Sequence, residues 1–144
     1  MCGYIHEGTE PPDQCPNCGS ARENFVEHKE GADIIHLSYD QKASYGTQPD
    51  TKPFFGDYAS LAPFIYNLPV GNHIPFHKHP TNDELFYIIK GRFRFSVGER
   101  TLVAVPGDMV QGKMDIPHMF KNIGDEPGVF LSVKGPKPVK TEFL

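Results

Sequence analysis

From Asp33 onward, the chain consists of short apolar runs separated by turn signals. Glycine and proline contribute 14 residues each and are spread along the whole chain, which suits short strands and many turns rather than long helices. Arg92–Val97 alternates polar and apolar side chains, as a half-buried antiparallel strand does, and Gly91 and Gly98-Glu99 are expected to form turns on either side. The pattern predicts an all-β sandwich or barrel.

Eight segments have the length and composition of strands, and the sequence contains no internal repeat or low-complexity tract. They are Ile34–Tyr39, Phe64–Leu68, Glu84–Lys90, Arg92–Val97, Thr101–Val105, Met109–Gln111, His118–Lys121 and Val129–Val133. The first part of the chain is polar and rich in turns, with too few apolar residues to form a core by itself. We therefore expect a small segment over residues 1–28 and one β domain over residues 33–144.

Charge and cysteine content exclude several classes of protein. The chain carries 14 Lys+Arg against 18 Asp+Glu, a formal net charge of -4, and has no basic run that could follow a phosphate backbone. No stretch approaches the roughly 18 apolar residues of a membrane span. The three cysteines all lie within the first 18 residues, which is a poor layout for a disulfide framework. We expect a cytoplasmic protein that binds neither nucleic acid nor membrane.

Two histidines and a glutamate are spaced as metal ligands. His77 and His79 are two residues apart, so on an extended chain both side chains point to the same face. After a short turn through residues 80–82, Glu84 begins the next strand and can return its carboxylate to the same point. Imidazole nitrogen together with carboxylate oxygen suits a first-row divalent ion. The spacing therefore predicts a metal site.

The residues around this site resemble the first motif of the cupin superfamily, G-x5-H-x-H-x3,4-E-x6-G. Every spacing fits, with the motif positions occupied by Gly71, His77, His79, Glu84 and Gly91. The second cupin motif is matched by Gly107-Asp108, His118 and Asn122, but its middle departs from the pattern. Where the family usually has P-x-G, this chain has Lys113-Met114-Asp115, and its proline is Pro117.

The resemblance implies a cupin β-barrel, which is a jelly roll or double-stranded β-helix. It also implies that His77, His79, Glu84 and His118 hold one divalent ion (Fe, Mn, Ni or Zn), with one or two positions left for water, dioxygen or a small-molecule substrate. An enzyme, a sensor of ligand, metal or redox state, and a structural metal site all remain open. In the enzyme hypothesis Tyr87 or Gln111 contacts the substrate. A homodimer is also expected, with Ile34–Tyr39 extending a partner's sheet.

The N-terminal segment carries a second candidate metal site. Cys15 and Cys18 lie three positions apart, and Gly19 lets backbone amides turn toward the sulfurs. With Cys2, they resemble the rubredoxin-like domain of rubrerythrins, which implies that Cys2, Cys15 and Cys18 bind one iron or zinc. That family has four cysteines, and the missing one would precede Met1. Three explanations are open: the start codon is placed too late, His6 or a chain terminus supplies the fourth ligand, or the site has decayed.

Overall fold

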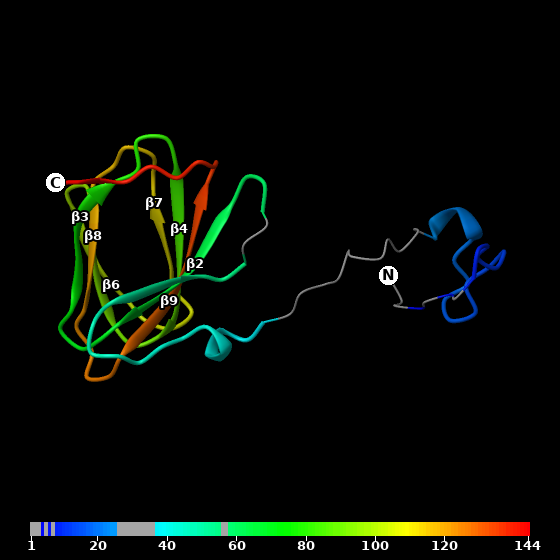
Figure 1. Cartoon of the computed structure of the whole chain (residues 1–144), viewed down its shortest axis with the longest axis horizontal. Helices are drawn as coiled ribbons and strands as arrows, with labels where there is room; N and C mark the ends of the chain where they lie inside the picture. The colour runs from blue at the N-terminus through cyan, green and yellow to red at the C-terminus, as the bar shows by residue number, and fades with distance from the viewer. Residues whose placement is uncertain (1–3, 5, 7, 26–36, 56–57) are drawn as a thin grey trace. The chain divides into compact units, whose positions relative to one another are not determined.

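The computed structural model describes residues 4, 6, 8–25, 37–55 and 58–144 (Figure 1). The chain divides into two compact units, Met1–His36 and Leu37–Leu144. The described residues contain two short 3-10 helices, η1 (Arg22–Asn24) in the smaller unit and η2 (Tyr39–Gln41) in the larger one. No helix in the described part of the chain is long and apolar enough to cross a membrane.

Ten strands in the described residues of the larger unit form two five-stranded antiparallel sheets. The first sheet has the order β1 (Asp50–Pro53), β2 (Ala62–Leu68), β9 (Gly128–Gly135), β4 (Asp83–Lys90) and β7 (Met109–Gly112). The second has the order β10 (Glu142–Phe143), β3 (His73–Lys78), β8 (His118–Asn122), β5 (Phe93–Val97) and β6 (Arg100–Ala104).

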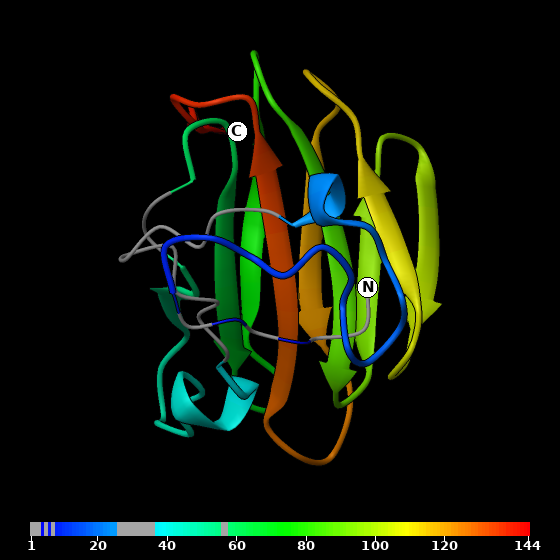
Figure 2. The ribbon, with the colours of Figure 1, turned by 90° about the vertical axis from the view of Figure 1, so that its right-hand side faces the viewer.

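The two sheets face each other, and the chain passes repeatedly between them (Figures 1 and 2). From β2 to β5, and again from β6 to β10, each strand lies in the sheet opposite the strand before it. This topology is that of a jelly roll, or double-stranded β-helix, so the predicted fold class is confirmed.

Aromatic side chains from both sheets fill the space between them. Five phenylalanine side chains are fully buried there, namely Phe86, Phe93, Phe95, Phe120 and Phe130. They make edge-to-face or tilted contacts with one another. In one of these contacts the ring centroids of Phe120 and Phe130 are 4.8 Å apart. Each contributes about 1.5–3 kcal/mol through burial. Gly128 is required by this packing, because a Cβ there would lie 2.3 Å from the ring of Phe93.

Seven of the eight predicted strands are present, with ends that shift by at most two residues. The exception is Ile34–Tyr39, whose residues 34–36 lie outside the described residues. Its described end is no strand, because the side chain of Gln41 accepts a hydrogen bond from the backbone amide of Ser38 and so caps the 3-10 turn η2. The predicted strand that was to pair with a partner's sheet is therefore wrong in its described part. The homodimer itself stays a prediction.

Candidate metal centre

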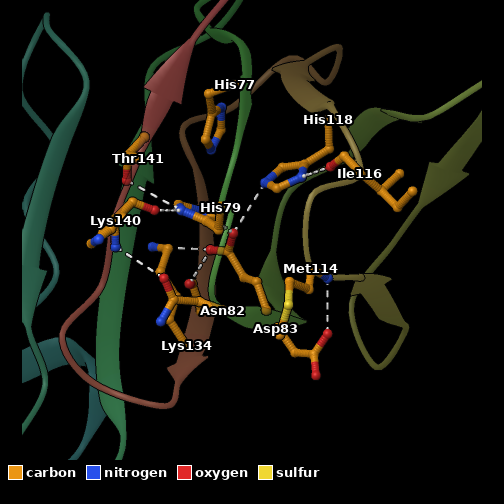
Figure 3. A network of polar contacts seen from close by, with 12 residues as sticks. His77, His79, Asn82, Asp83, Met114, Ile116, His118, Lys134, Lys140 and Thr141 are labelled. Atoms are coloured by element: carbon orange, nitrogen blue, oxygen red, sulfur yellow. Dashed lines mark hydrogen bonds and ion pairs between the residues drawn. The ribbon is translucent and has the colours of Figure 1, made fainter.

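Four side chains from the two sheets converge at one end of the barrel: His77, His79, Glu84 and His118. One potential ligand atom from each lies within 4.8 Å of the others, and every one of the four residues is at most 3% exposed. His77 on β3 lies opposite His118 on β8 (Figure 3). Glu84 comes from β4 in the other sheet. The structure thus brings together all four residues that the sequence singled out.

Backbone carbonyls fix the orientation of all three imidazole rings. Because a carbonyl oxygen only accepts, each Nδ1 must be the donor, which leaves Nε2 to face the cluster. The pairs are His77 with Pro75 at 2.9 Å, His79 with Lys140 at 2.7 Å and His118 with Ile116 at 3.0 Å. Metal-binding histidines have this arrangement, in which a bond at one ring nitrogen sets the tautomer of the other.

Glu84 provides the test of whether a metal ion fits. Its Oε2 lies 3.0 Å from Nε2 of His79 and 3.1 Å from Nε2 of His118. Both rings already donate through Nδ1, so each Nε2 turns a lone pair toward a lone pair of the Glu84 carboxylate. Such a contact is unfavourable unless a proton or a metal ion lies between the two atoms. Two ligands at about 2.1 Å from a metal and at right angles to each other are about 3.0 Å apart. The donor set and its spacing therefore fit a divalent ion.

The second oxygen of Glu84 is held by two side chains of β9. Oε1 accepts a hydrogen bond from the hydroxyl of Ser132 and lies 3.0 Å from Nζ of Lys134. Lys134 Nζ also donates to the hydroxyl of Tyr66 at 2.9 Å. These contacts leave Oε2 as the oxygen that faces the three rings.

The charge states of the cluster follow from burial and from these contacts. Burial lowers the pKa of His77 to about 4, so its ring is neutral near pH 7. Burial alone would raise the pKa of Glu84, but its contacts with the rings of His118 and His79 and the charge of Lys134 outweigh burial and hold that pKa below its usual range. Burial opposes the charge of Lys134, yet the negative charge of Glu84 raises its pKa overall. A carboxylate and an ammonium are thus buried side by side.

The loop before His118 explains the departure from the second cupin motif. Asp115 stands where the family usually has glycine, and its backbone has a φ of 60°, a left-handed conformation that aspartate tolerates better than most residues. Its amide donates to the carbonyl of His79 at 2.9 Å, and its carboxylate pairs with Lys78 at 2.7 Å. The loop therefore reaches the geometry that glycine would otherwise supply.

Two predicted substrate contacts are wrong. Tyr87 lies on β4, where Glu84 and Phe86 point inward, so its own side chain points to the outer face and is 41% exposed. Gln111 is also exposed and lies opposite Leu85 on the same outer face. For Tyr87 the two-residue period was a usable signal, because a strand that turns Glu84 inward turns Tyr87 outward.

The C-terminal segment completes the site, and the sequence did not indicate it. Asn82, which is 1% exposed, donates to the carbonyls of Pro136 and Pro138 and accepts from the amide of Lys140 at 2.9 Å. Lys140 then supplies the carbonyl that orients His79 (Figure 3). A backbone carbonyl has no sequence signature, but an asparagine between two ligands was a usable signal.

Replacing Asn82 by alanine is expected to weaken divalent-ion binding about 10- to 100-fold, as is usual when a partner of a ligand is lost. The reason is that residues 136–140 lose three hydrogen bonds and no longer hold His79. Competition with a chromophoric chelator measures the affinity. Asn72→Ala is the matched control, because the side chain of Asn72 donates to the carbonyl of Val70 in an exposed turn. Removal of residues 139–144 should reproduce the effect, and unchanged affinity in that shortened chain would contradict it.

The smaller unit has the turn expected of a cysteine knuckle. The amide of Gly19, with a φ of 71°, donates to the carbonyl of Cys15 at 2.8 Å, and the amide of Cys15 donates to the carbonyl of Ser20 at 2.8 Å. Cys15 is 5% exposed and Cys18 is exposed. Cys2 lies outside the described residues, so the convergence of three sulfur atoms stays a prediction.

Comparisons with known proteins agree with both units. Residues 64–134 match the family model of the cupin domain, and residues 1–26 match that of the rubredoxin-like domain of rubrerythrin. An uncharacterized protein of Methanocaldococcus jannaschii is 30% identical over 102 residues, which cover 65% of this chain and 80% of that protein. A dimethylsulfoniopropionate lyase of Ruegeria pomeroyi is 34% identical over 89 residues, which cover 61% of this chain but 41% of the lyase.

Among solved structures, the barrel is similar to that of an uncharacterized conserved protein with a double-stranded β-helix domain from Klebsiella pneumoniae. The TM-score is 0.70 at 20% identity, and the match covers 77% of this chain and 97% of the other. Motif spacing, strand topology and the family model agree. This chain therefore belongs to the cupin family and carries a rubredoxin-like segment at its N-terminal end.

Proposed function

We propose that the barrel is a mononuclear metal-dependent enzyme that acts on a small molecule. The observation that carries the proposal is the convergence of three carbonyl-oriented imidazoles and one carboxylate. When bound, a first-row ion supplies Lewis acidity and, for iron or manganese, one-electron chemistry.

The residues around the cluster have definable roles in this proposal. The backbone carbonyls hold the rings, while Ser132 and Lys134 hold the carboxylate. The rings of Phe86 and Phe120 lie 5.7 Å from that of His118 and 6.0 Å from that of His77, and they exclude water on the core side. An activity on a small molecule is also consistent with the named activity of the Ruegeria relative.

The rubredoxin-like segment supports a redox version of the proposal. Cys2, Cys15 and Cys18 would bind one iron or zinc, and with iron the segment would pass electrons to the reaction in the barrel. A non-catalytic sensor of ligand, metal or redox state is the second candidate. It is favoured by one observation, namely that all four proposed barrel ligands are at most 3% exposed.

The test begins with metal analysis of protein prepared without added metal. Oxygen uptake is then screened with small phenols, thiols and keto acids. Uptake that disappears in His77→Ala and His118→Ala supports the enzyme. His73→Ala is the matched control, because His73 lies on the same strand, is exposed and is outside the cluster. Tight retention of a small ligand without turnover would instead support the sensor.

A further inference from the structure

Lys134 is a buried lysine beside the proposed metal site. It is 4% exposed, and its Nζ lies 3.0 Å from Glu84 Oε1 and 2.9 Å from the hydroxyl of Tyr66. The same nitrogen lies 5.1 Å and 5.0 Å from the ring centroids of Phe64 and Tyr66. A buried charge is costly unless it is paired, so the carboxylate and the two aromatic faces together keep this ammonium in place.

The charge of the site follows by addition. Three neutral imidazoles and one carboxylate have a total charge of -1, so a divalent ion held by these four ligands alone would leave +1. The ammonium of Lys134, which bonds to the ligand carboxylate itself, raises that total to +2. In a buried site such an excess is screened weakly and favours an incoming negative charge.

We propose that Lys134 sets the metal centre to bind an anionic small molecule, a carboxylate or similar oxyanion, in preference to a neutral one. This inference rests on the proposed function, because it needs a divalent ion at His77, His79, Glu84 and His118. Lys134 acts here as a specificity-determining residue through the charge of the site and not as a ligand.

Neutralising Lys134 has two consequences of opposite sign. In Lys134→Met, the metal ion becomes the counter-ion of Glu84, so the divalent ion binds more tightly. The same change removes one positive charge, so an anion binds the loaded site more weakly. A lysine that only supported the structure would, when replaced, weaken both kinds of binding.

The experiment uses the full chain with Cys15→Ser and Cys18→Ser, so that added Co²⁺ reports on the barrel. Chelator competition gives the Kd for Co²⁺, and the visible spectrum of the loaded protein gives the Kd for formate and for formamide, its neutral isostere. In Lys134→Met we expect formate binding to weaken about ten-fold, Co²⁺ binding to tighten, and formamide binding to stay within about two-fold. Lys90→Met is the matched control, because Lys90 pairs with the half-exposed Glu126 instead.

Lys134→Gln is a second neutral variant in case the methionine form folds poorly. Formate binding that is unchanged in a folded neutral variant, or lost equally with formamide, overturns the inference while leaving the metal site intact. Failure of His77→Ala to lower Co²⁺ affinity would instead overturn the proposed function. The two failures are therefore distinguishable.

Discussion

Replacing Glu84 by alanine is expected to destabilise the metal-free protein by about 3–5 kcal/mol. Glu84 is 2% exposed and Lys134 is 4% exposed. The variant therefore leaves a buried ammonium that has lost its carboxylate and keeps its hydrogen bond to the hydroxyl of Tyr66. It also removes the acceptor for Ser132. Urea denaturation of chelator-treated protein measures the free energy of unfolding.

The double variant Glu84→Ala with Lys134→Met serves as the internal control. With both charges gone, it should recover a large part of the lost stability, because a missing pair costs far less than one stranded charge. Glu126→Ala is the matched surface control, since its ion pair with Lys90 is half exposed and contributes at most about 1 kcal/mol. A loss below about 1 kcal/mol in Glu84→Ala would contradict this prediction, because it would mean that Lys134 is not left as a costly buried charge.

The four proposed ligands were predictable because most of the signal is local. The two-residue period of a strand places His77 and His79 on one face, and Glu84 begins the next strand after a short turn. His118 is different, because its place opposite His77 depends on how β3 and β8 pair. Only the likeness to the second cupin motif made that distant residue visible.

Ser132 and Lys134 could not be predicted, because β9 carries apolar residues on both faces. Val129 and Phe130 are neighbours and both are fully buried, so alternation does not reveal the inner face. By sequence, Val129, Leu131 and Val133 form the more apolar set. In the structure the other set points inward. Its members are Phe130, which lies in the core, and Ser132 and Lys134, which lie beside the metal centre.

Replacing His77 by alanine is expected to weaken binding of a divalent ion at least about 100-fold, which is the upper range for losing only a partner of a ligand. Among the proposed ligands, His77 is the best choice for this test, because the two contacts between Glu84 and imidazole involve His79 and His118. The variant therefore removes one donor without separating Glu84 from Lys134. The buried phenylalanines should keep the metal-free barrel folded.

The stabilisation that the ion provides gives a second measurement of the same loss. At a free-ion concentration 100 times its Kd, the parent protein gains about 2.7 kcal/mol from binding. With a Kd raised 100-fold, His77→Ala gains only about 0.4 kcal/mol at the same concentration. His73→Ala, the control on the same strand, should match the parent. If His77→Ala unfolds without metal, the site stabilises the fold and the enzyme proposal loses its main support; if it keeps the full gain, the ion is bound elsewhere.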